Sequence, residues 1–153
     1  MRVIRNKFVI RNPKGFTLLE MVFVIALAGI FVGATFPLAQ KYLQRGKLDA
    51  AVREFASTAR YAQLRSQAGQ YDAAWGVKVS SGAITLFQGA TYATRTSTYD
   101  QAVSIPASFV VTGTSEYDFA KGTGRTTSGT LTITDTSGSS KAVTVNGFGR
   151  VDF

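Results

Sequence analysis

A long apolar run near the amino terminus constrains the fold of this chain more than any other feature. Between Lys14 and Lys41 only Glu20 carries a charge. At 1.5 Å of rise per residue, a helix over residues 16–39 is long enough to cross a bilayer, which takes about 20 residues. The positive charges that precede the run, with no acidic residue among them, are Arg2, Arg5, Lys7, Arg11 and Lys14. The positive-inside rule therefore predicts a single-pass membrane segment with a cytoplasmic amino terminus and the rest of the chain across the membrane.

Two other interpretations of this run stay open at this point. Ala26-Leu27-Ala28 has the small-residue pattern of a secretory cleavage site, although the sequence continues apolar as far as Ala39. The run is also long enough to be a plain membrane anchor. A carboxylate in a spanning helix costs about 2.5–3.5 kcal/mol on insertion scales, so Glu20 indicates a function for the helix beyond anchoring.

The composition argues against catalysis. The chain has no cysteine and no histidine, which excludes disulfides, zinc sites built on those residues and every Ser-His-Asp arrangement. Glu116 and Asp118 share one face of a predicted strand but are too few for a calcium site, and no helical pattern follows Gly122-Thr-Gly124 to form a phosphate-binding loop. We therefore expect no enzymatic activity, no metal and no cofactor.

The formal net charge of +8 is unevenly distributed along the chain. The excess lies in residues 1–15 and 41–70, whereas residues 71–153 contain equal numbers of basic and acidic side chains. A high isoelectric point of this origin says little about nucleic acid.

Residues 40–70 have the pattern of an amphipathic stem helix. One apolar stripe recurs at 4-3-4-3 spacing through Leu48, Val52, Phe55, Ala59 and Ala62. The small alanines predict close packing against a sheet, and Gly69 suits a carboxyl-terminal cap.

Residues 71–153 change to the short, β-branched segments of an antiparallel β domain. The expected strands are 75–79, 84–87, 108–112, 116–119, 130–134 and 142–145. We expect six to eight strands in one or two antiparallel sheets with the stem helix on one face, an α+β fold.

The residues around the isolated charge carry a family resemblance. Lys14-Gly15-Phe16-Thr17-Leu18-Leu19-Glu20 resembles the processing site of type IV pilins and type II secretion pseudopilins. That resemblance implies that residues 1–15 are a leader removed by prepilin peptidase, which cuts between Gly15 and Phe16 and methylates the amine of Phe16. Residues 16–39 would then form the transmembrane and filament-core helix.

The resemblance also assigns assembly roles within that helix. Glu20 matches the family glutamate and would meet the Phe16 amine of a neighbouring subunit. Gly29 and Gly33 form a GxxxG pair. Either the pair permits close packing of helices, or the two glycines are there only because glycine is common in transmembrane helices. Pro37 lacks an amide hydrogen and is expected to bend or loosen the helix. Gly29 and Pro37 also match a glycine and a proline of the family, between which the helix can lose helicity in assembled filaments.

Later motifs resemble the GspH/FimT type of minor pilin and pseudopilin. They are Ala59-Arg60-Tyr61-Ala62, Trp75-Gly76-Val77 and Gly149-Arg150. The resemblance implies a pilin-like fold and a structural subunit at or near the tip of a type II secretion pseudopilus or a type IV pilus. Its implied partners are other pilins or pseudopilins, prepilin peptidase, the inner-membrane assembly platform and, before assembly, the lipid bilayer. The implied location is the inner membrane and then a periplasmic or surface filament, with the β domain periplasmic.

The alternative function is DNA capture by a minor pilin during natural transformation. FimT-like proteins use a carboxyl-terminal Gly-Arg-x-Arg element, and Asp152 stands here where the second arginine would be. Candidate DNA contacts are Arg150, Lys121 and Arg125, provided that the fold brings them together. A negative charge at a phosphate contact opposes binding, so the sequence favours the structural subunit.

Overall fold

The computed structural model describes residues 15–153, and for residues 34–44 it describes the backbone alone. Helix α1 spans Leu18–Gln67. The chain divides into two units, Met1–Ala39 and Gln40–Phe153, which are described separately. Apart from Gly15, the predicted leader lies outside the described residues.

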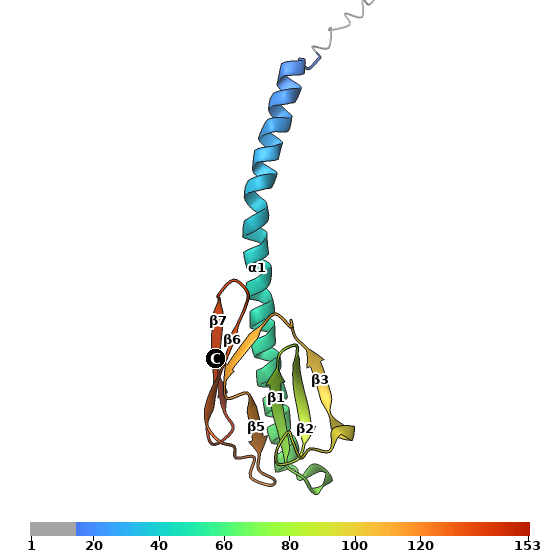
Figure 1. The fold of residues 1–153 in the computed structure, drawn as a ribbon, viewed down its shortest axis with the longest axis vertical. Coiled ribbons are helices and arrows are strands. Elements are labelled where there is room, and N and C mark those ends of the chain that lie inside the picture. The colour runs from blue at the N-terminus through green and yellow to red at the C-terminus, as the bar shows by residue number, and fades with distance from the viewer. Residues whose placement is uncertain (1–14) are drawn as a thin grey trace, which may run out of the picture. The chain divides into compact units, whose positions relative to one another are not determined.

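The second unit contains the carboxyl-terminal part of α1 and two antiparallel four-stranded sheets (Figure 1). The first sheet has the order β3-β2-β1-β5, and the second has the order β4-β6-β7-β8. The strands are β1 (Trp75–Ser80), β2 (Ala83–Gln88), β3 (Gln101–Ser104), β4 (Val110–Gly113), β5 (Glu116–Phe119), β6 (Gly129–Thr134), β7 (Ser140–Val145) and β8 (Val151–Asp152). Two short 3-10 helices, η1 (Gln70–Asp72) and η2 (Ser97–Tyr99), lie in the connections. The predicted α+β fold is confirmed.

All six predicted strands are present, and two further strands were not predicted. β3 has four exposed residues, of which only Val103 is β-branched, and β8 is a two-residue strand. Both are edge strands, and each is paired on one side only. Their place in the sheets comes from tertiary pairing, which local sequence patterns do not encode.

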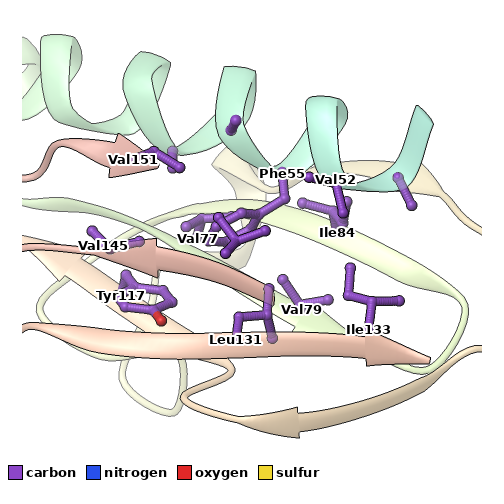
Figure 2. Packing of buried hydrophobic residues seen from close by; sticks show 14 of the residues in the cluster. Val52, Phe55, Val77, Val79, Ile84, Tyr117, Leu131, Ile133, Val145 and Val151 are labelled. Carbon is purple, nitrogen blue, oxygen red and sulfur yellow. The ribbon is translucent and has the colours of Figure 1, made fainter. Parts of the chain in front are cut away.

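The apolar stripe of α1 forms one wall of the core. Leu48, Val52, Phe55, Ala59 and Ala62 are all buried, as the periodicity predicts. Figure 2 shows Val52 and Phe55 projecting from α1 toward the strands. Strand residues that complete the core include Trp75, Val77, Ile84, Tyr117, Leu131, Ile133, Val143 and Val145.

The end of α1 is tied to the strands by a buried serine. The Ser66 hydroxyl accepts the amide hydrogen of Trp75 at 2.8 Å, and the Ser66 carbonyl accepts the amide hydrogen of Gly122 at 2.8 Å. The helix ends at Gln67, three residues before the expected limit at about Gln70. Gly69 follows with a φ of 61°, the left-handed conformation typical of a carboxyl-terminal cap.

The β6–β7 turn is organised by a buried carboxylate. Asp135 Oδ1 accepts hydrogen bonds from the Ser137 amide at 2.8 Å, the Ser137 hydroxyl at 2.7 Å and the Ser139 amide at 3.0 Å. The Ser137 hydroxyl contributes most to lowering the pKa of Asp135, and the backbone donors and Arg45 lower it further against an opposing effect of burial.

Ser137→Ala should therefore destabilise the protein in a pH-dependent way. A lowered pKa in the folded state means that the stabilisation is present above the usual aspartate pKa and is lost as the pH falls through the folded-state value. The substitution should reduce the free energy of unfolding at about pH 6, and this difference should shrink as the pH falls below the usual aspartate pKa of about 3.9. Urea unfolding of both proteins across this range checks the prediction, and a pH-independent difference would contradict it.

Candidate functional site

The predicted processing site lies immediately before α1. Gly15, Phe16 and Thr17 have no regular secondary structure, and α1 begins at Leu18. The Thr17 hydroxyl accepts the Glu20 amide hydrogen at 3.2 Å, and the Thr17 carbonyl accepts that of Met21 at 3.2 Å. Thr17 is therefore the N-cap of the helix. Our sequence analysis missed this role, although Thr-x-x-Glu is a known helix-start pattern.

The start of the helix that follows presents an exposed apolar surface. Phe16 is 77% exposed, Leu18 is 83% exposed and Phe31 is 69% exposed. Every large apolar residue from 16 to 32 is at least 44% exposed. Burial of apolar surface releases roughly 25 cal/mol per Å², so this helix has a strong tendency to bury itself against lipid or another protein.

The three other predicted assembly residues lie in the same helix. Among the described residues, and apart from the backbone of the helix itself, nothing lies within 4 Å of a Cβ built on Gly29 or on Gly33, so a second helix could approach closely there. The backbone is helical throughout residues 29–37, and the bend or loosening expected at Pro37 stays a prediction.

Among the residues that the structure describes, no helix has both the length and the apolarity required for a membrane crossing. The single-pass segment expected over residues 16–39 stays a prediction from the sequence.

The structure pairs two of the three candidate DNA contacts with carboxylates. Lys121 forms an ion pair with Asp72, and Arg150 Nε lies 3.0 Å from Asp152 Oδ1. Arg125 is different, because its guanidinium lies 5.2 Å from the ring centroid of Phe148, and no carboxylate among the described residues is within ion-pair distance of it. Pairing reduces the positive charge available to a phosphate, so Arg125 is the strongest of the three candidates.

Gln63 of α1 brings two of these loops together. Its side-chain amide donates hydrogen bonds to the carbonyl of Gly124 at 3.1 Å and to the carbonyl of Phe148 at 2.6 Å. The loop after β5 and the turn between β7 and β8 thus meet on one face of the helix. Gln63 has no local sequence signal, because its partners lie 61 and 85 residues away.

The two carboxylates considered for calcium do not act together. Glu116 accepts the Tyr92 amide hydrogen at 2.7 Å and lies 3.3 Å from Lys78 Nζ, so it anchors a loop. Asp118 is exposed on the same strand. Over the described residues, no group of three or more potential metal ligands occurs.

Gln63→Ala should release both loops. Loss of two hydrogen bonds should reduce the free energy of unfolding by about 1–3 kcal/mol and increase amide hydrogen exchange around Gly124 and Phe148. Gln67→Ala is the matched control, because Gln67 makes only a 3.4 Å contact with the Thr123 carbonyl. Equal effects of the two substitutions on exchange in the β7–β8 turn would contradict this role.

Comparison with known proteins adds two findings. Residues 10–36 match the family described as "Prokaryotic N-terminal methylation motif". The match includes Gly15, Phe16, Glu20, Gly29 and Gly33, and ends just before Pro37. No curated protein matches the chain.

A solved structure shares the fold. The minor pseudopilin EpsH from the Type 2 Secretion System of Vibrio cholerae matches with a TM-score of 0.52 and 12% sequence identity, over 69% of this chain and 94% of that chain. At this identity the likeness establishes architecture only. The chain thus combines a prokaryotic N-terminal methylation motif with a pilin-like α+β fold.

Proposed function

We propose that this chain is a minor pseudopilin or minor pilin of the GspH/FimT type, a structural subunit that works by assembly and performs no catalysis. Residues 1–15 are its leader, 16–39 its transmembrane and filament-core helix, 40–70 its stem and 71–153 its β domain. One observation carries the proposal: residues 16–32, at the start of α1, are largely apolar and exposed, have Glu20 as their single carboxylate and lie within the residues that match the N-terminal methylation motif. The likeness to a minor pseudopilin supports it.

The proposed assembly mechanism rests on charge pairing in an apolar environment. Cleavage after Gly15 frees the amine of Phe16, which is then methylated in a separate step and keeps its positive charge. Glu20 lies at the third position of the helix. When helices from several subunits pack together, the amine of one subunit neutralises Glu20 of its neighbour. A buried charge without its partner is strongly destabilising, so the pair selects one register between subunits.

The proposed course begins in the inner membrane, with the β domain on the periplasmic side. Prepilin peptidase processes the chain, and the assembly platform moves it into a filament beside other pilins or pseudopilins. The apolar surface of residues 16–32 then exchanges lipid for neighbouring helices, and Gly29 and Gly33 allow close approach. We place the subunit at or near the filament tip.

Mass spectrometry of the protein from its native membranes tests processing. We expect a product that starts at N-methylated Phe16 and disappears when prepilin peptidase is deleted. A product starting at Gly29 would instead indicate ordinary secretion. An uncut chain would indicate a plain anchor, and either result would overturn the proposal.

Glu20→Gln tests the assembly mechanism. The substitution keeps the size and the N-cap geometry but removes the charge, so processing should continue while recovery in sheared filaments falls at least about tenfold. Glu54→Gln, which removes another carboxylate of α1, should be incorporated normally. Normal incorporation of Glu20→Gln would refute the charge-pairing mechanism.

One observation keeps DNA capture as a second candidate. Arg125 has no carboxylate partner among the described residues and lies beside Phe148, which is 69% exposed. A cation next to an exposed aromatic ring suits a nucleic-acid strand. Fluorescence anisotropy of the full chain in detergent with labelled DNA should then show salt-sensitive binding that Arg125→Ala weakens. Absence of binding at low salt would eliminate this candidate.

A further inference from the structure

A cluster of aromatic residues with one arginine lies where α1 ends. It consists of Tyr61, Arg65, Tyr71, Trp75 and Tyr99, here called the aromatic–arginine cluster. Trp75 is fully buried at its base, whereas the tyrosines are exposed: Tyr61 by 46%, Tyr71 by 61% and Tyr99 by 37%. The ring centroids of Tyr71 and Tyr99 lie 4.9 Å apart, and each lies 6.3 Å from that of Trp75.

The backbone is strained where it presents this cluster. Tyr71 has φ 56° and ψ 25°, and Asp72 has φ 57°. A bulky residue such as tyrosine seldom adopts this left-handed conformation, and strained residues of this kind concentrate at functional sites. The ion pair of Asp72 with Lys121 and the 3.1 Å hydrogen bond from Trp75 Nε1 to the Gln70 carbonyl hold the turn. The conformation keeps the Tyr71 ring outside the core.

Arg65 supplies the only unbalanced charge of the cluster. Its guanidinium carbon lies 4.3 Å from the Tyr61 ring centroid and 4.4 Å from the Trp75 ring centroid. Its Nη2 donates to the Tyr61 hydroxyl at 2.7 Å, and its buried Nε has no hydrogen-bond partner among the described residues. No ion pair involving Arg65 occurs in that part of the chain.

The nearby carboxylates are already neutralised. Asp72 pairs with Lys121, and Asp100, next to Tyr99, lies 2.7 Å from Arg95 Nε. Arg65 therefore keeps its full charge between two rings, in a position that favours a carboxylate from outside the chain. A nucleic-acid strand would require several free cations here, and the cluster has one.

We propose that the aromatic–arginine cluster is a docking surface for another subunit of the same filament. That subunit contributes a carboxylate to Arg65 and an apolar side chain to the Tyr71–Tyr99 pair. Tyrosine, tryptophan and arginine are the residue types that dominate the binding energy of protein interfaces, and here they surround a buried anchor. The inference rests on the proposed function, because it takes its partner from the filament.

A zero-length carbodiimide cross-link tests the carboxylate. Arg65→Lys keeps the charge and introduces an amine, which the reagent joins to a carboxylate in direct contact. In sheared filaments that contain the full-length variant, we expect a cross-linked peptide between position 65 and an Asp or Glu of a different subunit. Arg60→Lys is the matched control, since Arg60 is an exposed arginine of α1 with no ring contact or ion pair among the described residues. The yield at position 65 should exceed that at position 60 about tenfold.

Tyr71→Ala tests the aromatic part. It should reduce recovery in filaments about tenfold, as expected for truncation of a dominant interface residue, while thermal unfolding confirms that the variant is folded. Phe153→Ala, which removes another exposed ring, should be recovered normally.

The outcomes separate the two proposals. Absence of the unsubstituted chain from filaments overturns the proposed function and this partner with it. If the chain is present in filaments, two results overturn only the docking surface. One is a set of cross-links confined to its own Asp72 or Asp100, and the other is an equal yield at positions 60 and 65. Normal recovery of Tyr71→Ala also overturns it.

Discussion

The second unit depends on the burial of one face of α1. Leu48, Val52 and Phe55 give that face its bulk, and Ala59 and Ala62 let the strands approach the helix closely. Neither four-stranded sheet has a second layer of its own, so each needs the helix and the other sheet to remove its apolar side chains from water. Ser66 then fixes the position of the helix end by binding backbone groups of Trp75 and Gly122.

Much of this architecture could be predicted because it follows from local periodicity. A spacing of three and four residues identified the buried stripe, and alternation identified strands such as β6 (Gly129–Thr134). The strand β3 (Gln101–Ser104) could not be found this way, because its residues are exposed and it exists by pairing with β2. Strand order likewise depends on contacts between distant segments, and no single-sequence pattern records them.

The same division applies to the sites. The spacing of Gly15, Phe16 and Glu20 is a local pattern, and the methylation-motif match covers all three residues. Two ion pairs decide which candidate DNA contact keeps an unpaired charge: Lys121 with Asp72, and Arg150 with Asp152. Only the folded chain reveals the first pair, because its residues are far apart in the sequence. Gln63 and the strained backbone at Tyr71 had no signal in the sequence, since their importance comes from neighbours far along the chain or from conformation.

The two sheets also impose an order on folding. The first sheet draws its strands from residues 75–119 and the second from residues 110–152. These ranges overlap because β4 precedes β5 in the chain but belongs to the second sheet, whereas β5 belongs to the first. During synthesis, α1 emerges long before β6, β7 and β8 are available to cover it. Until they arrive, apolar surface of the helix stays accessible to solvent, where it favours aggregation or capture by a chaperone. Completion of this domain is therefore a late event that waits for the last strands of the chain.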